Sequence, residues 1–274
     1  MSTLDETRYF SPLAPEAGAL PAKVTLVGAG PGDPELLTLK AAKALAAARF
    51  VLYDKLVSKD VLKLVNPEAG LIYVGKQSGC HTLTQDSIIV LMVRLARSGR
   101  SVVRLKGGDP YIFGRGGEEA LAAAGIEFEV VPGISAAQGM AAYAGIPLTH
   151  RDYATSVVFV AGHLRDEAGA RGLELDWSNL ARPHQTVVIY MGVATLGVVC
   201  AQLARHGLPS DTPAAVIENA TLPSQRTVAG TLPTLARVHA VRAPALVVIG
   251  EVVALHTQLA PAMRAATAAA APPR

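Results

Sequence analysis

The feature that most constrains this fold is a regular alternation of short apolar runs with segments of helical periodicity. The first half predicts strands at residues 23–27, 50–53, 71–74, 102–105 and 128–131, and helices at 35–48, 85–97 and 118–124. Strands that alternate with helices typically form a mainly parallel sheet covered by those helices. The first half is therefore predicted to be an α/β domain.

Two of the predicted helices have a clear apolar face. In residues 35–48 that face combines Leu36, Leu39, Ala42 and Leu45. In residues 85–97 the inward positions are Ile88, Ile89, Leu91, Met92 and Leu95. This spacing places the apolar side chains along one stripe of a helix, where they would pack on the sheet.

The pattern restarts after residues 142–152, which resemble a linker. Strands are predicted at residues 156–161, 185–191, 214–218, 226–231 and 246–250, with a helix at 196–206. We expect two α/β domains, the second around a mixed sheet. The expected parts are a flexible arm (1–21), an N-terminal domain (22–149), a C-terminal domain (150–257) and an Ala/Pro-rich tail that frays (258–274).

A glycine-rich turn follows the first predicted strand. Residues 28–34 read Gly-Ala-Gly-Pro-Gly-Asp-Pro. Backbone N–H groups in such a turn can bind an anion, but Asp33 replaces the third glycine of the dinucleotide pattern and Pro31 and Pro34 lack donors. The sequence leaves two interpretations: a tight strand-to-helix turn, or a ligand loop at the carboxyl edge of the sheet.

The densest glycine segment follows the fourth predicted strand. Residues 107–117 hold five glycines within eleven positions. A plain turn does not need so many, whereas a loop that brings its backbone against a ligand does. A third segment, residues 131–137, carries small residues after the fifth strand, and it suits either ligand contact or helix–sheet packing.

Composition excludes several functional classes. The net charge is only +3 and no block of like charges occurs, so no nucleic-acid partner is expected. Cys80 and Cys200 form no metal-ligand pattern, so no metal site is expected. Without a signal peptide or a spanning segment, we expect a cytoplasmic protein with no membrane partner. Every cation after Lys106 is arginine or histidine, which suits an acidic ligand but also fits a GC-rich genome.

Together these residues resemble a known family, the tetrapyrrole methylases, and within it the branch that methylates uroporphyrinogen III. The resemblance covers about residues 23–255. Its markers are residues 27–34, 52–54, 74–76, 104–117, 131–137, 143–151, 190–192 and 218–219. The Gly-Asp-Pro core is shared by the wider family, whereas Lys-Gly-Gly-Asp-Pro-x-x-Phe-Gly-Arg-Gly and Thr-His-Arg-Asp-Tyr are specific to this branch.

The resemblance implies two α/β domains with a ligand cleft between them, a homodimer, and S-adenosyl-L-methionine as methyl donor. The donor residues that it implies are Pro31, Gly107, Gly108, Asp109, Ile112, Ser135, Ala136, Met191, Ala220 and Ala245. Two positions depart from the family pattern. Ser135 replaces threonine and keeps a hydroxyl, and Ala220 replaces glycine, which adds strain only if that position needs a positive φ.

The resemblance also implies a reaction: C-methylation of uroporphyrinogen III at C-2 and C-7 to give precorrin-2, with S-adenosyl-L-homocysteine as by-product. By the same resemblance Asp54 is the proton acceptor and Lys76 the proton donor. A turn or helix cap is the alternative role for Asp54, and a plain surface lysine for Lys76. Because the substrate carries many carboxylates, Arg115 and Arg151 are expected to bind it, with surface salt bridges as their alternative.

Two rival functions stay open from the sequence. One is a methylase of a later precorrin or of a non-tetrapyrrole target such as diphthine or ribosomal RNA, and the other is a non-catalytic tetrapyrrole-binding or nucleoside-binding module. Asp54 and Lys76 together argue against the second. The flanks are too short for a fused NAD-binding or ferrochelatase segment, so we expect a stand-alone methylase that serves sirohaem, cobalamin or haem d1 synthesis.

Overall fold

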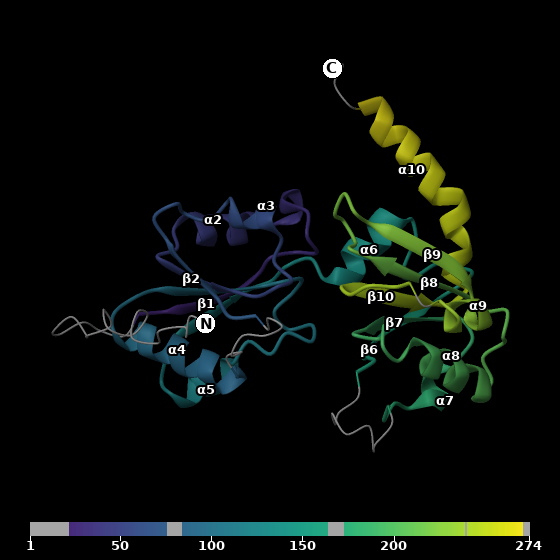
Figure 1. Ribbon diagram of the computed structural model, residues 1–274, viewed down its shortest axis with the longest axis horizontal. Coiled ribbons are helices and arrows are strands. Elements are labelled where there is room, and N and C mark those ends of the chain that lie inside the picture. The colour runs from purple at the N-terminus through teal and green to yellow at the C-terminus, as the bar shows by residue number, and fades with distance from the viewer. Residues whose placement is uncertain (1–21, 76–83, 164–172, 239, 271–274) are drawn as a thin grey trace. The chain divides into compact units, whose positions relative to one another are not determined.

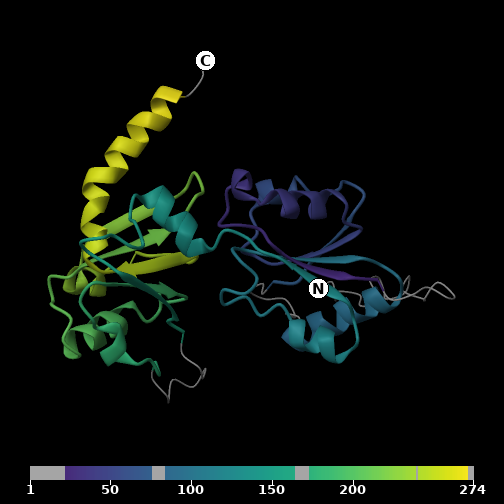
Figure 2. The same cartoon turned by 180° about the vertical axis from the view of Figure 1, so that it is seen from behind.

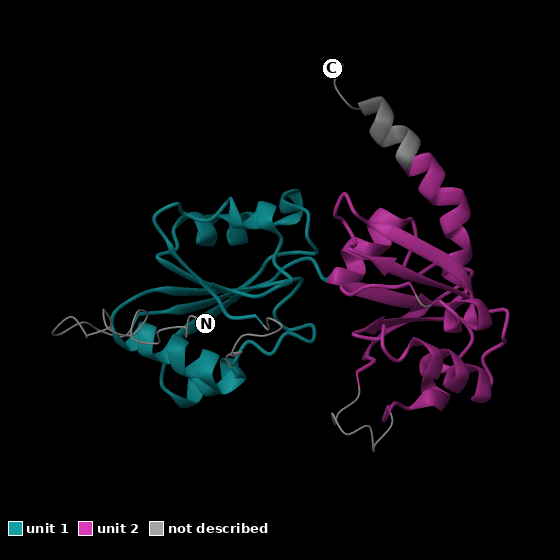
Figure 3. Cartoon of the chain, in the orientation of Figure 1, with its two compact units in different colours: residues 1–135 teal, residues 136–274 magenta. Residues whose placement is uncertain are grey.

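The computed structural model describes residues 22–75, 84–163, 173–238 and 240–270. The chain forms two compact units (Figure 3), of which the first is Met1–Ser135 and the second Ala136–Arg274. The predicted N-terminal arm, residues 1–21, lies outside the described residues.

The first unit is built on a parallel sheet, as the sequence predicts. Its strands are β1 (Val24–Gly28), β2 (Phe50–Tyr53), β3 (Gly70–Tyr73), β4 (Val102–Lys106) and β5 (Phe128–Val131). Their order is β3-β2-β4-β1-β5, and each neighbouring pair is parallel. All five carboxyl ends therefore meet at one edge, where the connecting loops can form a site.

Helices cover both faces of this sheet (Figure 1, Figure 2). They are the 3-10 helix η1 (Pro34–Leu36), α2 (Leu39–Ala46), α3 (Lys59–Leu62), α4 (Gln85–Arg97) and α5 (Glu118–Ala123). α2 and α3 bury Leu45 and Val61 against one face. α4 and α5 bury Met92 and Leu121 against the other. The strands are thus buried on both sides, which explains their almost continuous apolar sequences.

One predicted helix is divided in two. Where the sequence predicts a single helix at residues 35–48, the chain forms η1 and then α2. Thr38 separates them, because its hydroxyl accepts a hydrogen bond from the Ala41 N–H (3.1 Å) and caps α2. Leu39, predicted to face inward, is the first residue of α2 and is 83% exposed, while Ala41 and the predicted Leu45 are buried.

The second unit is built on a mixed sheet, which confirms the other half of the fold prediction. Its strands are β6 (Ser156–Ala161), β7 (Gln185–Tyr190), β8 (Pro213–Glu218), β9 (Arg226–Thr231) and β10 (Ala245–Ile249). Their order is β6-β7-β10-β8-β9, in which β6 and β7 are parallel and the other pairs antiparallel.

Helices pack on both faces of this sheet as well (Figure 1). They are α6 (Ala136–Ala144), α7 (Trp177–Leu180), α8 (Leu196–Arg205), α9 (Leu232–Ala236), the 3-10 helix η2 (Glu251–Leu255) and α10 (His256–Ala270). The cluster beneath α7, α8 and α9 joins Leu203 and Leu235 to Val216 and Val247 of the sheet. α6 lies on the opposite face.

Two boundaries differ from the sequence prediction. The compact units divide after Ser135, well before the expected join near residue 150, because α6 and the buried Ile146 belong to the second unit. The tail expected to fray from residue 258 is helical through Ala270, with Pro261 inside the helix. The high helix propensity of its alanines outweighs the single hydrogen bond that proline removes.

Candidate active site

The glycine loops after β1 and β4 bind each other through their backbones. The Gly30 N–H donates to the Gly108 carbonyl (3.2 Å), and the Gly108 N–H donates back to the Gly30 carbonyl (2.7 Å). Both glycines have a positive φ, at 70° and 69°. The predicted donor residues Pro31, Gly107 and Gly108 therefore lie side by side at the carboxyl edge of the first sheet.

Asp109 ties this pair of loops to a third loop, the one that follows β5. Its Oδ2 accepts a hydrogen bond from the Gly133 N–H (3.0 Å), and its Oδ1 accepts one from the Tyr111 N–H (2.8 Å). The half-buried Ile112 follows in the same loop, and the buried Ser135 ends the loop after β5. Because its carboxylate is occupied by backbone donors, Asp109 holds the shape of the loops.

Asp54 directly follows β2, and its carboxylate lies beside two cations of β4. Its Oδ2 is 3.2 Å from Nη2 of Arg104 and 3.6 Å from Nζ of Lys106. Its Oδ1 accepts a hydrogen bond from the Leu56 N–H (3.1 Å). The sheet explains this meeting, since β2 pairs with β4 in the register Leu52 to Arg104, and alternate residues of a strand face the same side.

Burial makes this ion cluster an unusual environment. The Arg104 side chain is only 3% exposed and that of Lys106 only 10%. Burial lowers the pKa of Arg104, and the Asp54 charge opposes that change. Burial and the nearby Arg104 charge lower the pKa of Lys106, while Asp54 and Glu118 act in the other direction. Buried ionisable groups whose pKa values are shifted by a charged partner are often found at functional sites.

Glu118 completes the cluster from the start of α5. Its Oε2 is buried and has no hydrogen-bond partner within the described part of the chain. Arg104, Lys106 and Glu118 were not among the site residues predicted from the sequence. A signal was present, because Arg104 and Lys106 are charges at alternate positions in a strand that is otherwise apolar, and a buried charge needs a partner.

In the second unit, a hydrogen bond connects the start of α6 to the end of β7. The hydroxyl of Tyr190 accepts a hydrogen bond from the Ala137 N–H (3.0 Å), so Ala136 lies close to the end of the strand. Met191 comes next, with a left-handed φ of 57° and 49% of its surface exposed. These are two of the predicted donor residues.

The other two residues of this unit that are predicted to bind the methyl donor, Ala220 and Ala245, lie near each other because β8 pairs with β10. Ala245, the first residue of β10, is paired with Glu218, the last residue of β8, and Ala220 follows two positions later. Ala220 is not among the residues with a positive φ. The strain that alanine would suffer in a left-handed position therefore does not arise here.

The remaining predicted residues, Arg115, Arg151 and Lys76, are not tied to the ion cluster or to the glycine loops by any contact described above. Arg115 is exposed at a left-handed φ of 53°. Arg151 is exposed in the turn between α6 and β6. Lys76 lies outside the described residues, so its proximity to Asp54 stays a prediction.

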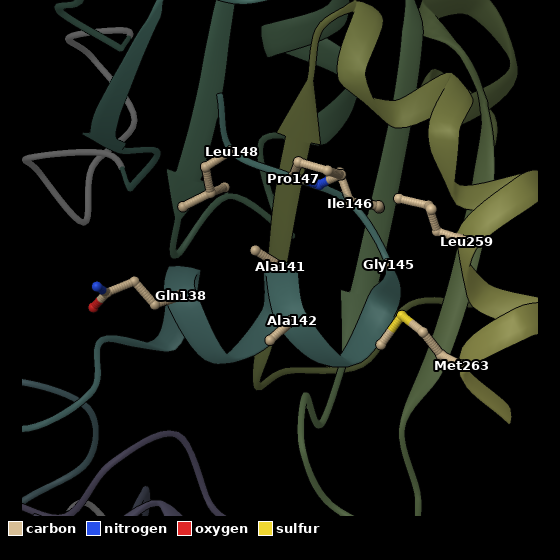
Figure 4. Close-up of a pocket in the computed structure, with 9 residues that line it drawn as sticks. All are labelled: Gln138, Ala141, Ala142, Gly145, Ile146, Pro147, Leu148, Leu259 and Met263. Carbon is tan, nitrogen blue, oxygen red and sulfur yellow. The ribbon is translucent and has the colours of Figure 1, made fainter. Parts of the chain in front are cut away.

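One apolar groove of about 390 Å³ lies between α6 and α10 (Figure 4). Its lining is almost wholly aliphatic, with Leu259 and Met263 facing Ala142 and Ile146, and Gln138 at one end. It contains none of the predicted catalytic residues. Elsewhere in the described part of the chain, no group of three His, Cys, Asp or Glu side chains is arranged as metal ligands. No described helix is both long and apolar enough to cross a bilayer.

Comparison with known proteins identifies the family. The model for "Tetrapyrrole (Corrin/Porphyrin) Methylases" matches residues 23–236. A sirohaem synthase of Nitrosospira multiformis is 56% identical over 87% of this chain and 51% of its own length. One of Gluconacetobacter diazotrophicus is 57% identical over 84% of this chain and 50% of its own length. The chain thus spans about half the length of these curated relatives.

Solved structures agree with the sequence matches. Uroporphyrin-III C-methyltransferase of Thermus thermophilus, also solved as a complex with S-adenosylhomocysteine, is 43% identical with a TM-score of 0.73, covering 85% of this chain and 100% of its own. A cobalt precorrin-4 methyltransferase is 28% identical with a TM-score of 0.72, covering 84% of this chain and 95% of its own. The fold, the loop geometry and these matches together show that the chain belongs to the tetrapyrrole methylase family.

Proposed function

We propose that this chain transfers methyl groups from S-adenosyl-L-methionine to C-2 and C-7 of uroporphyrinogen III, giving precorrin-2 and S-adenosyl-L-homocysteine. The main observation in support of this proposal concerns β4. Its Arg104 and Lys106 form ion pairs with Asp54, and the residues that directly follow the strand form the Gly107–Gly108 loop. A candidate proton acceptor and a candidate donor loop are thus joined by one strand. The similarity to the Thermus thermophilus enzyme supports the substrate and the donor.

The residues present fit an adenosyl donor. Such ligands need apolar surface with a few peptide groups. The first unit offers peptide groups in the glycine loops after β1 and β4, and the second unit, taken by itself, exposes the apolar side chain of Met191. We propose Pro31, Gly107, Gly108, Ile112, Ser135, Ala136, Met191, Ala220 and Ala245 as donor contacts. When bound, the donor supplies a sulfonium methyl group that is ready for displacement.

The protein then has two tasks, orientation and proton removal. Orientation of the nucleophilic pyrrole carbon, the methyl group and the sulfur in line can contribute about 7–11 kcal/mol. After methyl transfer the ring is cationic and must lose a proton. We propose that Asp54 accepts it, with its carboxylate held by Arg104. We also propose that Lys76 donates a proton elsewhere on the ring, in which case the ring loses a second proton to water and each methyl transfer releases one proton in all.

Exposed arginines suit the many carboxylates of the substrate. We propose Arg115 and Arg151 for this role, because guanidinium groups make paired hydrogen bonds to carboxylates. We also propose that the protein works as a homodimer in the cytoplasm. Sedimentation of the purified chain tests the dimer.

Anaerobic incubation with uroporphyrinogen III and methyl-labelled donor tests the function. We expect two labelled methyl groups per product molecule. In a parallel incubation with a later precorrin, label transfer to that precorrin but not to uroporphyrinogen III would support the rival methylase. Normal binding of S-adenosyl-L-homocysteine without transfer to any tetrapyrrole would support a binding module and overturn the enzymatic proposal.

Replacing Asp109 with alanine should weaken the binding of S-adenosyl-L-homocysteine about tenfold or more. The change removes the hydrogen bonds from the Gly133 and Tyr111 N–H groups, so the loops after β4 and β5 are no longer held together in the arrangement that binds the ligand. Asp109→Asn keeps one acceptor oxygen and should bind with intermediate affinity. Calorimetry measures both, and unchanged affinity in the alanine variant would refute the role of this tie.

A further inference from the structure

The connection between β8 and β9 has an unusual backbone on both sides of Ala220. Asn219 has a φ of 47° and Thr221 a φ of 70°, both in the left-handed region. For a β-branched residue such as Thr221 this region is strongly disfavoured, and Thr221 is also 6% exposed. Strain of this kind persists only where the surroundings impose it, and it gathers at functional sites.

An ion pair holds the base of this connection. Glu218 and Arg226 are paired across β8 and β9, and the guanidinium donates from Nε and Nη2 to the two carboxylate oxygens, each at 2.8 Å. Glu218 is 6% exposed, and the hydrogen bonds from Arg226 lower its pKa. The Asn219 N–H donates to the Pro244 carbonyl (3.0 Å) and fixes the first step beyond the strand.

The far side of the connection is held by the side-chain amide of Gln225. Its Oε1 accepts a hydrogen bond from the strained Thr221 N–H (2.8 Å). Its Nε2 donates to the Tyr143 carbonyl (3.1 Å), in the last turn of α6, where carbonyls have no partner within the helix. Gln225 is therefore a bridge from Thr221 to α6, and Figure 1 and Figure 2 show the connection beside that helix.

We propose that Gln225 is a positioning residue for the methyl donor. By holding Thr221 in its left-handed conformation, the amide fixes the peptide groups around Ala220 in the arrangement that meets the donor. This inference rests on the proposed function, in which Ala220 contacts the donor. Gln225 itself acts through the backbone and does not touch the donor.

A second glutamine of the same unit provides a matched control. Gln185, at the start of β7, also uses Nε2 to bind backbone carbonyls, those of Asn179 (2.9 Å) and Leu180 (3.3 Å). It lies at the opposite end of its strand from Met191. Replacing either glutamine with methionine removes comparable hydrogen bonds, but only one of them adjoins Ala220.

Calorimetric titration with S-adenosyl-L-homocysteine tests the inference on the wild type, Gln225→Met and Gln185→Met. We expect the dissociation constant of Gln225→Met to rise about tenfold and that of Gln185→Met to stay within about twofold of the wild type. In turnover, the KM for the donor should rise in Gln225→Met while kcat stays within about twofold.

Gln225→Glu is a second, milder variant that can be measured if Gln225→Met does not fold. Its carboxylate can accept from Thr221 but cannot donate to Tyr143, so an intermediate loss of about threefold is expected. Wild-type affinity in a folded Gln225 variant, or an equal loss in Gln185→Met, would overturn the positioning role alone. Failure of the wild type to bind the ligand would overturn the proposed function and this inference with it.

Discussion

Replacing Asp54 with asparagine should lower the rate of methyl transfer about 10²–10⁴-fold while leaving the affinity for S-adenosyl-L-homocysteine within about twofold. The amide keeps an acceptor for the Leu56 N–H but cannot take the proton that the methylated ring must lose. The glycine loops, in which we place the donor, do not depend on this carboxylate for their hydrogen bonds. Single-turnover assays and calorimetry measure the two quantities.

The same change should also lower stability, because it removes the carboxylate paired with Arg104 and Lys106 and leaves these two buried cations with only the Glu118 charge beside Lys106. The loss should fall at the lower end of about 3–5 kcal/mol, since Asp54 is 19% exposed. Asp60→Asn is the control: its pair with Lys63 is 56% and 75% exposed and is worth at most about 1 kcal/mol. A methyl-transfer rate in Asp54→Asn close to that of the wild type would remove Asp54 from the mechanism.

Replacing Gly28 with alanine should destabilise the first unit by about 3 kcal/mol or more and abolish measurable donor binding. A β-carbon there would lie 2.6 Å from the Gly133 nitrogen and 2.7 Å from the Gly108 oxygen. Both are backbone atoms of the loops after β5 and β4, so relief of the clash must separate those loops. Urea denaturation with calorimetry measures both effects.

Gly197→Ala is the control for this prediction. Gly197 lies in α8, and a β-carbon there would meet only the Ala236 oxygen, at an ordinary 3.7 Å. Alanine in a helix should therefore leave stability unchanged or raise it by up to about 1 kcal/mol. A Gly28→Ala protein as stable as the wild type would show that the three loops are not closely packed at this point.

The strands could be predicted from the sequence because their signal is local. β2, β5, β6 and β9 begin and end at the residues that the sequence predicts, and α4 matches its predicted range of residues 85–97. The helices that were missed lack such a signal. α6 is made largely of small residues on all sides, and α7 and α9 are too short to show a period.

The site could be predicted only where its residues are chemically conspicuous. Glycine density locates the loop after β4, but the partners of Asp54 depend on which strand neighbours β2. β2 lies between β3 and β4, and the partners of Asp54 come from β4, almost fifty residues later in the chain, which no local pattern reveals. The bridging role of Gln225 likewise depends on the packing of the β8–β9 connection against α6.

The balance of charge around Asp54 has a consequence for repeated turnover. Arg104 and Lys106 face Asp54 and the Glu118 charge, so the cluster holds as many negative as positive groups. Under the proposed mechanism each methylation deposits a proton on Asp54 and leaves a buried surplus of positive charge. A second methylation must wait until that proton is released to water. An enzyme that methylates twice therefore has to deprotonate Asp54 between its two methyl transfers.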